Sequence, residues 1–191
     1  MLFVFNIRII YFLILNMSIQ GYILNQQNKT QMFQEQNDLP LSEEAKKYKA
    51  FNNSEFRNIQ RDTSIPKFLL ASRLIQSKGI ECYITAAKRI KAKYPHVEFS
   101  LAGIFNLDNP ESISLQLFEE IKTDADIRFL GEVSHSNMEE CFHKNNIFVL
   151  PSEREGLPKV VTEAATTGMP LILSNVPGCK DCVINNKSGK L

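Results

Sequence analysis

Apolar positions between residues 67 and 174 alternate between short runs and longer stretches with helical spacing. A short apolar run bounded by polar or turn residues is typical of a buried β-strand, whereas apolar residues three and four positions apart are typical of an α-helix face. Five runs predict strands at residues 67–71, 97–103, 127–131, 147–151 and 170–174. Four stretches between them predict helices at residues 78–95, 109–125, 136–146 and 157–168.

The stretch at residues 78–95 shows the helical spacing clearly, because a single apolar stripe runs along it and stops before Pro95. The members of this stripe are Ile80, Tyr83, Ile84, Ala87 and Ile90. The second helix is expected to begin at Asn109 or Ser112, since side chains of these types cap helix N-termini. Strands that alternate with helices over so short a segment need right-handed crossovers. The pattern therefore predicts an α/β fold: a Rossmann-like parallel sheet with helices on both faces.

The segments before this domain differ from it in composition. Residues 1–24 are mostly apolar with one charge, Arg8, and fit a membrane-associating segment, a signal-like segment, or a core element whose partners lie elsewhere. Residues 25–66 are rich in Asn and Gln and have little apolar periodicity, which is typical of a linker. We therefore predict three parts: an apolar segment, a linker, and a domain at residues 67–191.

Composition narrows the function classes. The 191 residues are 43% hydrophobic and carry 22 Lys and Arg against 21 Asp and Glu, a formal charge of +1. A chain this close to neutral lacks the basic field that drives non-specific nucleic-acid binding, so no nucleic-acid partner is expected. Its four cysteines do not form a secreted disulfide framework, which favours a cytoplasmic location, with membrane association through residues 1–24.

Ligands of a parallel α/β sheet bind at the carboxyl ends of the strands. The loop after the first predicted strand, residues 72–79, carries two cations, Arg73 and Lys78, just before a helix start. Two fixed cations suit the pyrophosphate of a nucleoside diphosphate, and Gly79 allows a close backbone approach. The alternative is a solvated pair, although cations at a helix N-terminus oppose the helix dipole and need a compensating anion.

The strongest motif is a pair of acids, Glu155 and Glu163, with seven residues and a Gly-Leu-Pro turn between them. A carboxylate accepts two hydrogen bonds from vicinal sugar hydroxyls. The backbone N–H groups of Gly156, Leu157 and Lys159 fall at a helix start, where they are available to a sugar or a phosphate oxygen. The alternative places Glu155 as a complement to the helix dipole and Glu163 on the surface, but the apolar neighbours of Glu163 in the sequence disfavour a solvated position.

Three segments carry a family resemblance: ASRLIQSKG at residues 71–79, FLGEVS at residues 129–134, and FVLPSEREGLPKVVTEAATTGMPLILSNVPGCKD at residues 148–181. They resemble the carboxyl-terminal, nucleotide-sugar-binding domain of retaining GT-B glycosyltransferases of family 4 (glycosyl transferases group 1). The resemblance is to those members that build polysaccharide or lipid-linked oligosaccharide chains from UDP-sugars. It covers about residues 68–191 and implies a metal-independent hexosyltransferase.

The resemblance implies a role for each candidate residue on the nucleotide. Arg73 and Lys78 hold the diphosphate and stabilise the charge that develops on the leaving group. Glu163 binds the ribose hydroxyls, and the backbone around Glu132 and Val133 meets the base. In the family the donor phosphate itself helps to accept the acceptor's proton. No metal and no cofactor other than the nucleotide-sugar substrate is therefore implied.

The donor sugar is expected at Glu155, together with the N–H groups of Gly156, Leu157 and Lys159. The family's EGFG turn is EGLP here, which removes one backbone donor and stiffens the helix start. A complete member also has an amino-terminal acceptor-binding domain, and none is evident before Phe68, while the domain is expected to be truncated at its carboxyl terminus.

The expected function is therefore transfer of a sugar from a UDP-sugar, with retention, to a glycan or lipid-linked acceptor, in concert with the missing acceptor domain. Three alternatives remain open. The first is a binding-only fragment of such an enzyme. The second is a nucleotide-sugar epimerase of the same architecture, and the third is a membrane-anchored interaction protein that binds no nucleotide.

Weaker motifs favour structural roles. Asp124 and Asp126 match the DxD spelling of metal-dependent sugar transferases but precede a strand, so they are expected at the amino end of the sheet, away from the ligand. Cys179 and Cys182 lack the second pair that a zinc site needs. The three histidines show no metal-ligand spacing, although His135 follows the third strand and is expected near the ligand cleft.

Overall fold

The computed structural model of the chain describes residues 62, 64–183 and 189–191. The predictions for the apolar segment at residues 1–24 and for the linker up to residue 61 lie outside the described residues. Among the helices that are described, none has the length and apolar character needed to cross a membrane.

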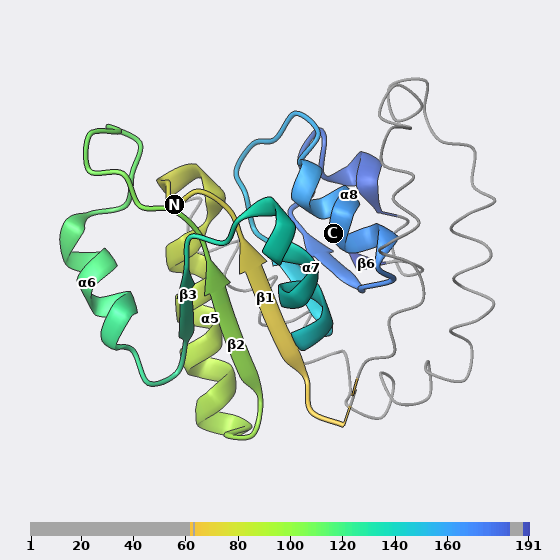
Figure 1. Cartoon of the computed structure of the whole chain (residues 1–191), viewed down its shortest axis with the longest axis horizontal. Coiled ribbons are helices and arrows are strands. Elements are labelled where there is room, and N and C mark those ends of the chain that lie inside the picture. The colour runs from red at the N-terminus through yellow and green to blue at the C-terminus, as the bar shows by residue number, and fades with distance from the viewer. Residues whose placement is uncertain (1–61, 63, 184–188) are drawn as a thin grey trace.

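Six parallel strands form one sheet in the described part of the chain, in the order β3-β2-β1-β4-β5-β6 (Figure 1). The strands are β1 (Lys67–Ala71), β2 (Glu98–Ala102), β3 (Arg128–Gly131), β4 (Ile147–Leu150), β5 (Leu171–Leu173) and β6 (Gly189–Lys190). The five predicted strands are confirmed to within one residue at either end. The sequence pattern missed β6, because its two residues carry no apolar run.

Four α-helices alternate with the first five strands. They are α5 (Ile80–Lys93), α6 (Leu115–Thr123), α7 (His135–Lys144) and α8 (Lys159–Thr166), with short 3-10 helices η3 (Gln76–Lys78) and η4 (Lys180–Cys182). The α/β parallel fold predicted from the sequence is therefore confirmed.

The predicted start of α6 is wrong. Its cap is Ser114, whose hydroxyl accepts a hydrogen bond from the N–H of Leu117 at 3.1 Å. Asn109 instead accepts from the N–H of Glu111 at 2.9 Å, and the Ser112 hydroxyl donates to the carbonyl of Asn106 at 2.6 Å. Both side chains thus close turns in the loop before the helix, since short polar side chains serve turns as readily as caps.

The sheet separates two hydrophobic clusters because successive strand residues point to opposite faces. Phe68 and Leu70 of β1 pack with α5 on one face, whereas Leu69 and Ala71 pack on the other face with α8 and with Phe142 of α7. The helices therefore cover both faces, as the sequence predicts.

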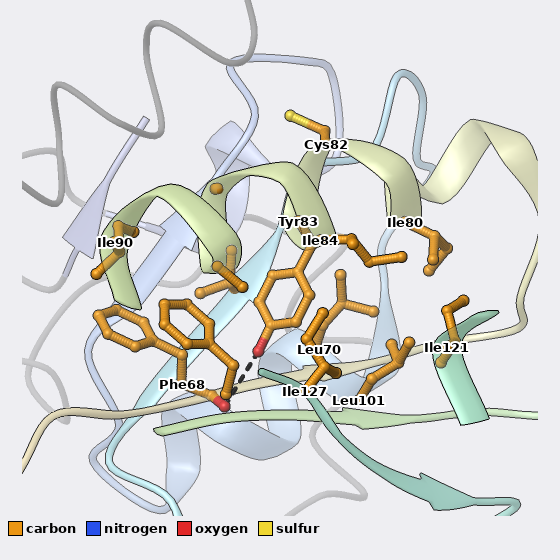
Figure 2. Packing of buried hydrophobic residues seen from close by; sticks show 14 of the residues in the cluster. Phe68, Leu70, Ile80, Cys82, Tyr83, Ile84, Ile90, Leu101, Ile121 and Ile127 are labelled. Carbon is orange, nitrogen blue, oxygen red and sulfur yellow. Dashed lines mark hydrogen bonds between the residues drawn. The ribbon is translucent and has the colours of Figure 1, made fainter. Parts of the chain in front are cut away.

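Tyr83 fixes α5 against the first face (Figure 2). Its buried hydroxyl lies 2.9 Å from the carbonyl oxygen of Ser100 in β2 and 3.1 Å from that of Phe68 in β1. The ring meets Phe99 edge-on at 5.7 Å between centroids. Burial raises the pKa of the Tyr83 phenol well above its usual value, so this hydroxyl remains a hydrogen-bond donor.

The strand order reverses direction between β1 and β4. Helix α5 leads from β1 to β2 on one face, whereas α7 leads into β4 and α8 into β5 on the other. Loops that leave adjacent strands toward opposite faces open a crevice at the carboxyl ends of those strands, where ligands of such sheets bind. The loops at this point are residues 72–79 after β1 and 151–158 after β4.

Candidate functional site

Two glycines let the loops at the carboxyl edge touch. Gly79 has φ +70°, and a Cβ there would lie 2.9 Å from the carbonyl carbon of Pro151 and closer to its oxygen. Gly178 has φ +82°, and a Cβ there would lie 2.5 Å from the carbonyl carbon of Gly156 and 2.7 Å from the carbonyl oxygen of Glu155. The loop after β4 is therefore supported from both sides. The neighbour that comes close to the backbone of Gly79 in this structure is the carbonyl group of Pro151.

Glu155 is the centre of a small cluster between the two loops. Its Oε1 accepts one hydrogen bond from Nζ of Lys78 at 2.6 Å and a second from Oγ of Ser152, also at 2.6 Å. The Glu155 side chain is only 8% exposed, and that of Lys78 is 16% exposed. Glu155 is thus the anion that the cation Lys78 needs at a helix start.

The second oxygen of this carboxylate, Oε2, accepts no hydrogen bond from any residue in the described ranges. Polar atoms of a side chain as little exposed as this one are usually satisfied by a hydrogen bond in native proteins. This carboxylate oxygen lies beside a cation, at the edge of the sheet where the fold binds ligands, and is available to a hydroxyl donor.

Glu163 lies in α8 and is also buried, with a side chain 9% exposed. The surface alternative is therefore wrong for this residue. Its Oε1 lies 3.7 Å from Nδ1 of His135, which begins α7 after β3. His135 is 69% exposed, and its presence at this edge confirms that the loop after β3 faces the same region.

The turn between the two acids presents backbone donors. Helix α8 begins at Lys159, with Pro158 before it, and no side chain caps this end. Among the residues that the structure describes, the N–H groups of Gly156 and Leu157 donate no hydrogen bond. Such N–H groups near a helix start attract oxygen atoms of negative or hydroxyl groups.

Three further candidates stand apart from the Glu155 cluster. Arg73 is exposed at the start of the loop after β1, and its guanidinium pairs with no group within the described residues. Glu132 is exposed and Val133 is half-buried after β3, where Val133 packs against the second cluster. Within the described part of the chain, no hydrogen bond or ion pair joins these three residues to Lys78, Glu155 or Glu163.

The two cysteines near the site are structural thiols, Cys179 buried and Cys182 half-buried. Burial, with a smaller effect of Glu155, raises the pKa of Cys179 to about 12, and burial raises the pKa of Cys182 to about 11. All four cysteines of the chain are free. Raised pKa values disfavour the thiolate that metal binding or redox chemistry requires. In the described ranges no three His, Cys, Asp or Glu side chains come together as a metal site.

Asp124 and Asp126 lie at the opposite edge of the sheet, as their position before β3 predicts. Asp124 pairs with Lys88 at 2.9 Å and Asp126 with Lys91 at 3.7 Å, so both bind the side of α5. Burial opposes ionisation of Asp124, but the Lys88 ammonium prevails and lowers the pKa of this carboxyl.

The sequence missed Ser152 and Gly178 as functional positions. A serine three residues before a glutamate in a strand-exit loop is a weak signal, because this spacing is common in turns. Gly178 lies far from Glu155 in the sequence, and only the folded chain shows that its bare backbone supports the loop.

A parallel sheet whose strand order reverses between β1 and β4, with loops that meet at the carboxyl ends of these strands, defines an α/β protein of the class that binds ligands at this edge. Residues 51–191 match the family described as glycosyl transferases group 1. The chain belongs to this family. Its fold matches the C-terminal domain of GT-B glycosyltransferases.

Curated relatives with sequence similarity are sugar transferases. The gpi3 subunit of phosphatidylinositol N-acetylglucosaminyltransferase from Schizosaccharomyces pombe is 34% identical over 111 residues, which are 58% of this chain and 24% of that protein. An N,N'-diacetylbacillosaminyl-diphospho-undecaprenol alpha-1,3-N-acetylgalactosaminyltransferase from Campylobacter jejuni is 29% identical over 150 residues, 78% of this chain and 36% of that protein. The chain thus spans only about a quarter to a third of the length of these relatives.

Solved structures agree on the fold. The C-terminal domain of a glycosyl transferase group 1 family protein (LpcC) from Francisella tularensis has a TM-score of 0.56 at 23% identity, covering 68% of this chain and 70% of that one. Sucrose-phosphate synthase from Thermosynechococcus elongatus also has a TM-score of 0.56, at 27% identity, covering 67% of this chain and 32% of that one.

Proposed function

We propose that this domain binds a UDP-sugar and that the sugar is transferred, with retention, to a glycan or lipid-linked acceptor. One observation supports this most strongly: the buried carboxylate of Glu155, with Oε1 held by Lys78 and Oε2 unpaired within the described residues, lies at the ligand-binding crevice. A diphosphate and a sugar hydroxyl are the chemical groups that a cation and a carboxylate at this spacing bind together.

The diphosphate binds Lys78 and Arg73. The Lys78 ammonium has three donors and gives one to Glu155, which leaves two for phosphate oxygens. Arg73 supplies a second cation from the start of the same loop, and its guanidinium is not engaged by the described residues. Together they offset the charge that develops on the departing diphosphate, an electrostatic contribution that the folded loop has already oriented.

The sugar binds Glu155 and the N–H groups of Gly156 and Leu157, and Lys159 supports the same turn at the start of α8. Glu163 accepts the two ribose hydroxyls, because its carboxylate is buried in α8 and faces the loop that carries His135. The remaining part of the nucleotide, the base, lies along the backbone of Glu132 and Val133.

The transfer step breaks the bond between the anomeric carbon and the phosphate oxygen, and forms a bond from that carbon to an acceptor hydroxyl oxygen on the same face. The acceptor's proton passes to a phosphate oxygen of the leaving UDP. The step balances without a metal or a protein base, so metal independence and the lack of a cofactor remain part of the proposal.

Two relatives favour N-acetylglucosamine as the donor sugar. One is the Schizosaccharomyces pombe protein above, and the other is a solved pneumococcal O-GlcNAc transferase, described in complex with UDP and GlcNAc. Names among the relatives also include capsular polysaccharide biosynthesis and an undecaprenol-linked substrate, which support a glycan or lipid-linked acceptor.

We further propose that the acceptor is held by a second domain, because the matched region covers about a third or less of most relatives. Cytoplasmic location and peripheral membrane association through residues 1–24 stay predictions from the sequence. The boundaries at residues 24 and 66 likewise stay predictions.

Titration of the full chain with UDP, uridine and UDP-N-acetylglucosamine tests the proposal. UDP should bind at least about tenfold more tightly than uridine, since one charged hydrogen bond is worth about 1.5 to 3 kcal/mol. Equal affinities for UDP and uridine would contradict the role of Lys78 and Arg73. Formation of an epimerised nucleotide sugar from UDP-N-acetylglucosamine alone would instead assign the chain to the epimerases.

A further inference from the structure

Ser152 is a buried polar residue that the proposed reaction does not use. It lies two residues after the end of β4, at the point where the sheet order reverses, and it is 0% exposed. Its hydroxyl donates to Oε1 of Glu155 at 2.6 Å. This length is typical of the strong hydrogen bonds that a hydroxyl makes to an ionised carboxylate.

Two donors therefore converge on one oxygen of Glu155. The Lys78 ammonium reaches Oε1 from the loop after β1, and the Ser152 hydroxyl reaches it from the same loop as Glu155. Rotation of the carboxylate about its terminal bond would break both hydrogen bonds. Oε2 is consequently held in one position, and it is the oxygen left without a donor in the described part of the chain.

The two donors differ in what happens to them when a diphosphate binds. Lys78 ends a flexible four-carbon chain, and in the proposed function its ammonium also contacts phosphate oxygens. The ammonium is thus shared between the phosphate and Glu155. Ser152 is buried and short, so it cannot follow the phosphate and keeps its hydrogen bond to Oε1 throughout.

We propose that Ser152 is a positioning residue that orients Glu155 toward the donor sugar and so sets the preference for a UDP-sugar over UDP. The inference rests on the proposed function, because it takes Glu155 as the residue that contacts the sugar. Ser152 itself touches no part of the donor and acts only through the Glu155 carboxylate.

The experiment measures binding of UDP and of UDP-N-acetylglucosamine, UDP-glucose and UDP-galactose to the full chain by calorimetry. Ser152→Ala removes the hydroxyl. Ser152→Cys keeps its size but donates weakly, and Ser152→Thr keeps the hydroxyl. Ser100→Ala is the matched control, because Ser100 is also a buried serine but lies in β2 and makes no side-chain hydrogen bond to Glu155.

For the UDP-sugar that binds most tightly, we expect Ser152→Ala and Ser152→Cys to lose about tenfold in affinity, because a misdirected Oε2 gives up about one hydrogen bond between a sugar hydroxyl and the charged carboxylate. Affinity for UDP should change less than twofold. Ser152→Thr should recover most of the loss, and Ser100→Ala should alter neither ligand. If the Ala variant does not fold, as judged by its melting curve, the Cys variant gives the same comparison.

A second cycle separates positioning from general support of the loop. In a Glu155→Ala background, Ser152→Ala should change the affinity for the UDP-sugar less than twofold, because no acceptor is left at this position for Ser152 to orient. A full tenfold loss in that background, or equal losses for UDP and the UDP-sugar, overturns the inference while the proposed function stands. A wild-type chain that binds neither UDP nor any of the sugars overturns both.

Discussion

Replacement of Gly178 by alanine should weaken the domain more than the same replacement at Gly131 or Gly156, because two costs combine at this position. Its φ of +82° lies in the left-handed region, where a side chain costs about 1 to 2 kcal/mol. A Cβ would also lie 2.5 Å from the carbonyl carbon of Gly156, so the loop that carries Glu155 must move. Displacement of packed groups costs about 1 to 3 kcal/mol more.

The other two glycines provide matched controls. Gly131 has φ +70° but nothing within 4 Å of a Cβ, so Gly131→Ala carries the backbone cost alone, about 1 to 2 kcal/mol. Gly156 has neither a positive φ nor a close neighbour, so Gly156→Ala should change the free energy of unfolding by less than about 1 kcal/mol. All three changes remove a glycine from the unfolded chain, and this contribution cancels in the comparison.

Urea denaturation of the three variants gives the free energies directly. Gly178→Ala should lose about 3 kcal/mol, clearly more than Gly131→Ala, and should also lose affinity for a UDP-sugar because the Glu155 loop is displaced. Equal losses for Gly178→Ala and Gly131→Ala would refute the argument, since they would show that the turn at Gly178 does not support the loop.

Two further predictions concern the acids and the thiols. Glu163→Ala should weaken UDP binding about tenfold or more. Glu155→Ala should leave UDP binding nearly unchanged and should reduce discrimination among UDP-sugars. Equal effects of the two variants on UDP binding, measured by calorimetry, would contradict the assigned roles. Burial raises the pKa of Cys82 to about 11, against about 8.5 in an unfolded chain. Folding therefore favours the protonated thiol, and this contribution to the free energy of unfolding should be lost as pH rises from about 8.5 to about 11. A Cys82→Ala variant whose urea midpoint falls as steeply with pH as that of the wild-type chain would argue against it.

Much of the fold could be predicted because its central strands are buried on both faces. Runs such as residues 68–71 and 147–151 are continuously apolar, and this pattern survives in a single sequence. The helix stripe from Ile80 to Ile90 is equally clear. The start of α6 could not be predicted, since Asn109, Ser112 and Ser114 are all competent caps and only the tertiary contacts of the preceding loop decide among them.

The residues of the candidate site could be predicted from the sequence, but the hydrogen bonds and ion pairs among them could not. Glu155, Glu163 and Lys78 follow from spacing and from the loops that they occupy. The ion pair of Lys78 with Glu155 joins residues that lie far apart in the sequence, and it depends on the strand order that brings β1 beside β4. The support from Ser152 and Gly178 arises from the backbone path of one loop, which no periodicity encodes.

The melting temperature of the full chain with and without UDP tests the central claim most directly. A ligand that binds only the folded crevice stabilises it by about 2.7 kcal/mol at one hundred times its Kd. For a domain of this size that corresponds to a rise of about 10 °C. We predict a concentration-dependent rise with millimolar UDP and a much smaller one with uridine. No shift at millimolar UDP would contradict the claim that Lys78, Glu155 and Glu163 form a nucleotide-sugar site.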